Sequence, residues 1–261
     1  MKAVLKILPL LLITVYLITA FGFTTDERKS IICTEVNVII RDSLTSMFYT
    51  KGDIREMIQD SRTGIQGYPV SEINTRKLEE LFLGKPYISK VDIYTTMKGI
   101  LTVKIKQREP VIRVFTNESR SYYLDNEGYI MPESRNFTPF VIVANGYFPG
   151  GDEINTAGNL HNIKNKQRYR PWFDALELVK KINEDDFWRS QFVQIYLNRK
   201  GKFELIPRVG GHLIILGEIS DLDEKFYKLK TLYLKGLPVE GWNNYEKIDL
   251  RYKHQVVCTK R

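Results

Sequence analysis

Hydrophobic and polar residues recur in short, regular blocks, and the first blocks after residue 30 predict a small α+β domain. The spacing of its apolar residues indicates a strand, two short helices and two further strands joined by a turn at Met97–Gly99. Asn74 or Thr75 can cap the second helix, and Gly84–Pro86 can end it. The predicted elements are a strand at 31–42, a helix from 51–53, a helix from 74–75, and strands at 87–96 and 100–108.

A second, strand-rich region follows Glu109–Pro110. Apolar residues recur at every third or fourth position over 172–182 and 221–233, which predicts two helices with one buried face each. Short apolar blocks bounded by turn residues predict strands at 111–115, 121–125, 128–132, 140–145, 192–198, 202–207 and 212–217. The last three of these follow one another as a meander, so we expect an antiparallel sheet with flanking helices.

The chain ends in KIDLRYKHQVVCTKR, which alternates with a period of two. Ile248, Leu250 and Val256 fall on one face, while charged residues fall mostly on the other. The pattern predicts one terminal strand over 247–258. Exposed Lys and Arg are typical of a strand at the edge of a sheet, where they discourage accidental pairing. Such an edge can also accept a strand from a partner protein.

Residues 7–23 form an uncharged apolar run that is long enough to be a transmembrane helix. Positive charge precedes it in the short tail at 1–6, while the flank at 26–29 sums to zero. The positive-inside rule then places the N-terminus in the cytoplasm and the bulk of the chain in the periplasm. A cleaved signal peptide ending near Ala20–Gly22 is the alternative, and it also exports the chain.

Composition gives no sign of catalysis, a cofactor or nucleic-acid binding. The formal net charge is +8, but basic and acidic residues are interspersed, which is typical of a solvated surface. His161, His212 and His254 have no metal-ligand spacing, nor do Cys33 and Cys258, for which we expect no disulfide. No nucleophile or phosphate-loop motif is present. We therefore expect a protein that is not an enzyme and has no cofactor, metal site or small-molecule substrate.

Five phrases, taken in order, resemble the bacterial FtsQ/DivIB cell division family. They are GYPVSEINTRKLEELFLGKPYISKVDIY (67–94), LTVKIKQREPVIRV (101–114), YYLDNEGYIMP (122–132), ELIPRVGGHLIILG (204–217) and KIDLRY (247–252). The resemblance implies a membrane anchor, a polypeptide-transport-associated (POTRA) domain at 31–109 and a β-domain at 110–261. It also implies a non-enzymatic scaffold of the divisome in the inner membrane.

The resemblance further implies that the terminal strand pairs with FtsB, and through it with FtsL, among other divisome membrane proteins. The matching positions are Ile248, Asp249, Leu250, Arg251, Tyr252, Lys253, Val256 and Val257, with Arg199 as a candidate for the same surface. Arg251 would pair with an acidic group, Tyr252 would add apolar area, and Asp249 would orient Arg251. The family often has a short polar turn after its Arg-Tyr, whereas here the sequence is KHQVV, so we expect the strand to continue.

Two other functions remain open from the sequence. POTRA domains also serve in outer-membrane assembly or secretion adaptors, which usually continue into a β-barrel. An exported enzyme or carbohydrate-binding module would need carboxylates or exposed aromatic residues in a groove. The terminal charges could also do no more than keep a free strand edge soluble.

Overall fold

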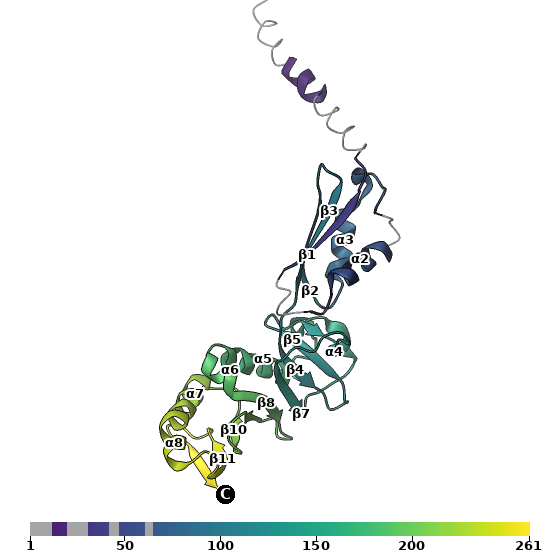
Figure 1. The fold of residues 1–261 in the computed structure, drawn as a ribbon. Coiled ribbons are helices and arrows are strands. Elements are labelled where there is room, and N and C mark those ends of the chain that lie inside the picture. The colour runs from purple at the N-terminus through teal and green to yellow at the C-terminus, as the bar shows by residue number, and fades with distance from the viewer. Residues whose placement is uncertain (1–11, 20–30, 42–46, 61–64) are drawn as a thin grey trace, which may run out of the picture. The chain divides into compact units, whose positions relative to one another are not determined.

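The computed structural model describes residues 12–19, 31–41, 47–60 and 65–261 (Figure 1). They divide into two compact units, Met1–Arg108 and Glu109–Arg261. Residues 12–19 are helical, and the rest of the predicted transmembrane run over 7–23 lies outside the described residues. Among the helices that the structure describes, none is both long and apolar enough to span a bilayer.

The first unit has the predicted β-α-α-β-β order. Its elements are β1 (Glu35–Arg41), α2 (Lys51–Asp60), the 3₁₀ turn η1 (Val70–Glu72), α3 (Thr75–Leu83), β2 (Ile88–Thr95) and β3 (Ile100–Gln107). Strand β3 is central, with β1 parallel to it on one side and β2 antiparallel on the other. Asn74 caps α3 as predicted, because its side-chain oxygen accepts the amide of Lys77 over 2.9 Å.

One face of each helix builds the core of this unit. Ile54 and Ile58 of α2 are buried, as are Leu78 and Phe82 of α3, and each pair is four residues apart. They pack with alternate residues of β3, whose Leu101, Val103 and Ile105 are fully buried. The apolar residues of the strand and helix patterns therefore pack together in a single hydrophobic core.

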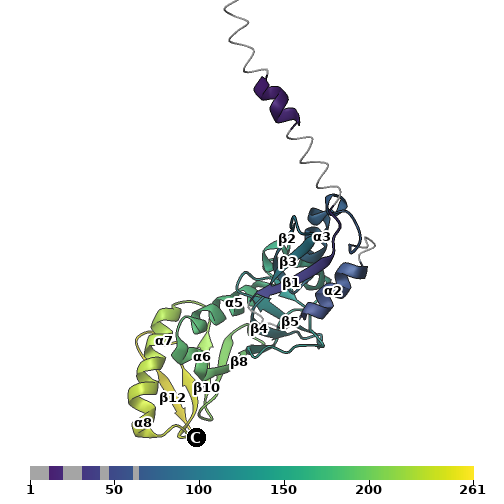
Figure 2. The ribbon, with the colours of Figure 1, turned by 45° about the horizontal axis from the view of Figure 1, so that its top comes forward.

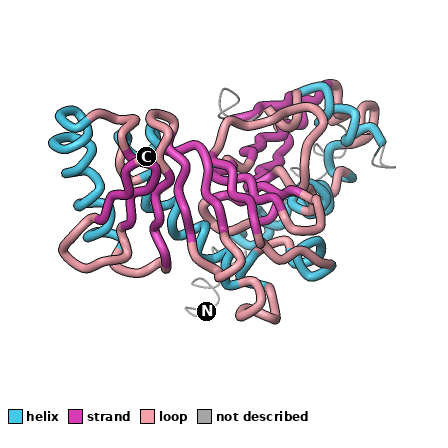
Figure 3. Tube along the Cα trace, turned by 90° about the horizontal axis from the view of Figure 1, so that it is seen from below, coloured by secondary structure: helices cyan, strands magenta, loops and turns pink. Residues whose placement is uncertain are grey.

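The second unit is built on a nine-stranded sheet in the order β12-β11-β10-β9-β8-β7-β4-β5-β6, whose strands run side by side in Figure 3. Its strands are β4 (Pro110–Phe115), β5 (Ser121–Asp125), β6 (Ile130–Met131), β7 (Ile142–Gly146), β8 (Phe192–Leu197), β9 (Phe203–Pro207), β10 (Leu213–Gly217), β11 (Tyr245–Asp249) and β12 (Val257–Lys260). The meander β8-β9-β10 is antiparallel as predicted.

The expectation of an antiparallel sheet is wrong, because the sheet is mixed. Strand β7 is parallel to both β4 and β8, and β10 is parallel to β11. Parallel neighbours need a long connection, which β5 and β6 provide between β4 and β7 and which helical crossovers provide for β7–β8 and β10–β11. One crossover contains α4 (Asp152–Ala157), the 3₁₀ turn η2 (Leu160–Asn162), α5 (Arg170–Asn183) and α6 (Asp186–Gln191). The other contains α7 (Leu222–Thr231), a π-helical turn (Leu232–Gly236) and α8 (Leu237–Glu240).

These helices pack on the strands to form the larger core. Trp172, Leu178 and Val179 of α5 are fully buried in it, and Leu229 of α7 joins the same cluster. Helices α6 and α7 lie next to one another in two views (Figures 1 and 2). The ion pair between Lys230 and Asp185, 2.6 Å long, links them. Helix α7 thus has a fixed place beside the last strands of the chain.

The predicted single strand over 247–258 is wrong. Strand β11 ends at Asp249, the chain turns, and β12 returns antiparallel to β11. His254 has a φ of 57°, a left-handed conformation that a continuing strand does not contain. The KHQVV segment therefore lies within and after a turn, and the C-terminal edge of the sheet is β12.

Candidate functional site

The turn after β11 carries the candidate site, and its central residue is Arg251. Its guanidinium forms a two-pronged ion pair with Asp249, with Nε 2.9 Å from Oδ1 and Nη2 2.6 Å from Oδ2. The amide of Arg251 donates to the same carboxylate over 3.0 Å. Asp249 is buried, whereas 52% of the Arg251 side chain is exposed. Asp249 therefore orients a guanidinium that solvent and partners can still reach.

Each member of this pair stabilises the charge of the other. Burial raises the pKa of Asp249, but the hydrogen bonds from the side chain and backbone of Arg251 outweigh burial and hold that pKa below its ordinary value. The bonds to Asp249 in turn raise the pKa of Arg251. Both groups are consequently ionised at neutral pH.

A cleft of about 420 Å³ opens beside Arg251 where β7, β8, β9 and β10 end or turn. Four basic residues and one acidic residue line it, together with two tyrosines. The lining residues are Tyr147, Tyr196, Asn198, Arg199, Lys200, Lys202, Glu204, Ile215 and Arg251. The excess of basic groups suits an acidic ligand group.

Arg199 reaches this cleft from the turn between β8 and β9. Its Nε donates a hydrogen bond to the hydroxyl of Tyr147, and its guanidinium lies 5.5 Å from the centre of that ring. The hydroxyl contact raises the pKa of Arg199. The hydroxyl thus orients Arg199 without the carboxylate ion pair that Asp249 forms with Arg251. Arg199 and Arg251, which the sequence placed on one candidate surface, thus line one cleft.

Strand β12 provides the free edge of the sheet. Among the described residues it pairs only with β11, and it is the outermost strand on that side of the sheet. The amide of Arg261 donates inward to the carbonyl of Asn244 over 3.1 Å. Amides alternate in direction along a strand, so the amides of Lys260 and Cys258 point outward, where another strand could bind them.

The remaining predicted residues divide into buried and exposed groups. Ile248 and Leu250 are fully buried and pack in the core, so a contact of their side chains with a partner is excluded in this structure. Val256 packs partly against the same core. Tyr252, Lys253 and Val257 are exposed, on the turn and at the start of β12.

Sequence reasoning missed several residues of the site. Tyr196 belongs to a strand that the sequence predicted and Tyr147 follows another, but no local signal indicated that they line one cleft with Arg199. Gly217 is the clearest omission. A Cβ on Gly217 would lie 2.8 Å from Cγ of Arg251, so the absence of a side chain makes room for Arg251. A glycine at the end of a predicted strand was the available signal.

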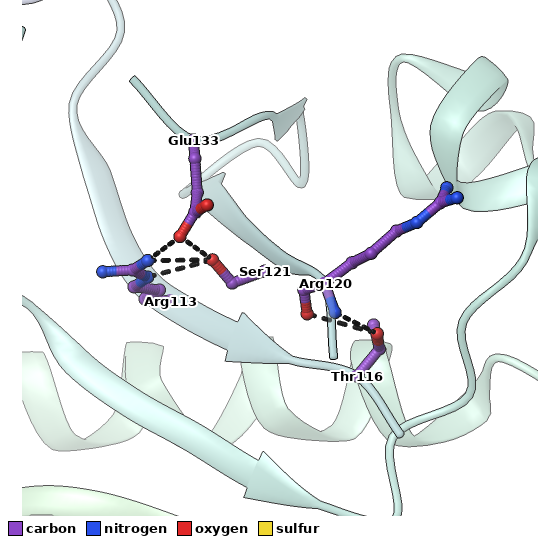
Figure 4. A network of polar contacts seen from close by, with 5 residues as sticks. All are labelled: Arg113, Thr116, Arg120, Ser121 and Glu133. Atoms are coloured by element: carbon purple, nitrogen blue, oxygen red, sulfur yellow. Dashed lines mark hydrogen bonds and ion pairs between the residues drawn. The ribbon is translucent and has the colours of Figure 1, made fainter. Parts of the chain in front are cut away.

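A second polar cluster lies on β4 and β5 (Figure 4). Nε of Arg113 donates to Oγ of Ser121 over 3.1 Å, and both Arg113 and the Ser121 hydroxyl bond to Glu133. At the hairpin tip the amide of Arg120 donates to the hydroxyl of Thr116 over 3.3 Å. These groups satisfy one another, so the cluster holds the hairpin and its following loop together.

The described part of the chain contains no cluster of side chains that could bind a metal ion. Within residues 12–19, 31–41, 47–60 and 65–261, no three His, Cys, Asp or Glu side chains gather closely enough to bind an ion. Cys33 and Cys258 are both free thiols.

Two family models match the chain, one on each unit. Residues 31–106 match the POTRA-like domain. Residues 109–259, more than half of the chain, match the model described as FtsQ/DivIB, C-terminal related. A comparison with curated proteins finds no match. The second match covers every residue that lines the cleft, and it covers the terminal hairpin formed by β11 and β12 up to residue 259.

Proposed function

The chain belongs to the FtsQ/DivIB family, and from this premise we propose that it is a non-enzymatic scaffold of the bacterial divisome. Its two units bind other division proteins and carry out no chemistry themselves. The POTRA-like unit takes part in recruitment near the membrane, and the larger unit docks partners through its C-terminal edge.

The docking partner in this proposal is FtsB, together with FtsL. FtsB adds a strand to the free edge of β12, where main-chain hydrogen bonds supply affinity and side chains choose the partner. The single observation that carries the proposal is the position of the basic cleft. Arg199 and Arg251 line it, and Arg251 belongs to the turn that leads into β12.

Arg251 and Tyr252 have separate tasks in this mechanism. An acidic side chain of FtsB enters the cleft and pairs with Arg251, whose guanidinium Asp249 already orients. Tyr252, with 46% of its surface exposed, supplies apolar contact area on the turn. Because Ile248 and Leu250 are core residues, they act only by holding β11 in the sheet.

We further propose a single-pass anchor over residues 7–23, with the N-terminus in the cytoplasm and the two units in the periplasm. The uncharged apolar run and the positive residues before it support this topology. Alkaline extraction of membranes tests the anchor. The protein should stay in the membrane fraction, whereas release into the soluble fraction would indicate a cleaved signal peptide.

Depletion and co-purification test the scaffold role. Cells that lack the protein should grow as filaments, and the tagged full-length chain should co-purify FtsB and FtsL from solubilised membranes. The double variant R251E/Y252A should lose FtsB while keeping its fold. Unchanged capture of FtsB by that variant would refute docking through the terminal hairpin.

A further inference from the structure

Helix α7 directs polar side chains at two backbone segments next to Arg251. Glu224 and Lys228 are four residues apart and therefore lie on one face of the helix. Both contact the turn over residues 250–254. Lys225, next to Glu224, contacts the segment that follows β10. No feature of the sequence pattern had connected α7 with the terminal hairpin.

Lys228 and Glu224 bind the backbone of the turn directly. Nζ of Lys228 donates to the carbonyl of Tyr252 over 2.5 Å and to that of Leu250 over 3.4 Å. Oε1 of Glu224 accepts the amide of His254 over 2.9 Å. The two side chains also pair with each other at 3.5 Å. Backbone groups on both sides of Arg251 are thus held by one helix.

The segment that follows β10 is fixed from the same helix. Lys225 is almost fully buried, and its Nζ donates to the carbonyl of Glu218 over 2.7 Å. Glu218 follows Gly217, against which the Arg251 side chain lies. The surface beneath Arg251 and the backbone that carries it are therefore both tied to α7.

The ammonium group of Lys228 is a largely buried charge, so losing its hydrogen-bond partners would cost free energy. Only 11% of the Lys228 side chain is exposed. An ammonium group removed from water needs hydrogen-bond acceptors, and the two turn carbonyls and the Glu224 carboxylate provide them. If the turn moved away, Lys228 would lose two of these three acceptors. The native turn is consequently favoured over alternatives that would place Arg251 elsewhere.

We propose that Glu224 and Lys228 are positioning residues that preset Arg251 for its acidic partner. They contact only the chain itself and act through the turn. This inference rests on the proposed docking of FtsB at the terminal hairpin. Its physical basis is preorganisation, since a guanidinium already held in place loses less conformational freedom on binding.

The test is a double-mutant cycle on the full-length protein, with affinity for the FtsB–FtsL complex measured in detergent. K228M should weaken binding about tenfold, and K228R should restore most of it, because a guanidinium can still donate to both carbonyls. K235M is the matched control. Lys235 is exposed on the π-helical turn that follows α7, and its replacement should change affinity less than about twofold.

The cycle is completed by R251A, alone and with K228M. If Lys228 acts through Arg251, K228M should weaken binding less than about twofold in the R251A background. An equal effect in both backgrounds would mean that Lys228 only stabilises the fold, and would overturn the inference. So would a normal affinity of K228M when R251A is impaired. A normal affinity of R251A would instead refute the proposed docking site.

Folding is monitored separately by tryptophan fluorescence, because all three tryptophans lie in the second unit. If K228M does not fold, E224A makes the same test, since it removes the acceptor of the His254 amide from a partly exposed position. E224A should then weaken binding in the wild-type background and not in R251A. An equal effect of E224A in both backgrounds would overturn the inference. So would a normal affinity of E224A when R251A is impaired.

Discussion

Arg199 and Arg251 line the same cleft although they come from different turns of the sheet, one after β8 and one after β11. Tyr147 orients the first and Asp249 the second. Two arginines that line one cleft are better suited to bind a carboxylate than a lone surface arginine.

Charge reversal in the cleft should therefore disrupt partner binding strongly. We expect R251E to lower the affinity for the FtsB–FtsL complex at least tenfold. R199E should lower it less, because the turn between β8 and β9 is farther from β12 than the turn that carries Arg251. Since both face one ligand group, the double variant should fall short of the product of the two effects. Calorimetric titration of the solubilised full chain measures this.

K253E is the control for these variants. Lys253 is exposed on the same turn but does not line the cleft. Its reversal should change affinity less than threefold, and the small effect should disappear at high salt, as expected for a screened surface charge. A loss as large as that of R251E would show that overall charge, not the cleft, drives binding.

A second prediction concerns the free edge of β12. The amide of Lys260 points outward, because that of Arg261 donates inward to Asn244. K260P removes this donor, whereas K260T changes the side chain and keeps the amide. If FtsB adds a strand to β12, K260P should reduce capture several-fold and K260T should leave it near wild type. Equal capture by both variants would argue against strand addition.

The elements with local signals were predictable from the sequence, and the pairings between distant elements were not. Asn74 caps its helix as predicted, and β3 forms within the strand predicted at 100–108. The parallel pairs β7–β8 and β10–β11 depend on helical crossovers, and no local pattern specifies which distant strand is a neighbour.

The turn after β11 shows the same limit at the candidate site. Alternation correctly places Ile248 and Leu250 in the core, and it continues by chance through residues that in fact turn. Lys228, which donates to the turn, and Glu224, which accepts from it, hold that turn from more than twenty residues earlier in the chain. The sequence could thus propose Arg251 as a candidate, whereas its position beside the cleft could not be predicted.

A third prediction concerns the turn between β2 and β3 in the first unit. Gly99 has a φ of 76°, and a Cβ there would lie only 2.2 Å from the Ile32 carbonyl oxygen. G99A should destabilise this unit by more than the roughly 1–2 kcal/mol that a left-handed alanine costs. G67A is the control, because Gly67 also has a positive φ, 88°, but no atom within 4 Å of the added Cβ.

Hydrogen exchange measures this difference, since the first unit contains no tryptophan. Amides that pair β1 with β3 should lose more protection in G99A than in G67A. Equal losses would mean that backbone strain alone accounts for the effect, and that the contact with Ile32 contributes nothing.

The last prediction is a pH dependence of stability that originates at His212. This residue is buried next to β10, its Nε2 lies 2.8 Å from the hydroxyl of Tyr233, and the side chain of Arg261 donates to the carbonyl of neighbouring Gly211. Burial lowers the pKa of His212 below 6.5, against the opposing effect of the Trp242 backbone, and the charge of Arg261 lowers it further.

A lowered pKa in the folded state fixes the sign of the effect. Well above pH 6.5 the histidine is neutral in both states and stability does not depend on it. Below pH 6.5 the unfolded chain binds a proton that the folded chain does not, so the free energy of unfolding falls by up to about 1.4 kcal/mol per pH unit until the folded-state pKa is reached. Tryptophan fluorescence during urea unfolding should record this loss in the second unit.

H212Q should flatten this profile between pH 7.5 and 5, because glutamine can still donate to Tyr233 and does not titrate. H161Q is the control, since His161 is exposed and its replacement should leave the slope unchanged. If the slope below pH 6.5 survives in H212Q, another group is responsible. If it disappears, protonation of His212 weakens the part of the sheet that carries the terminal hairpin, and partner binding should weaken over the same pH range.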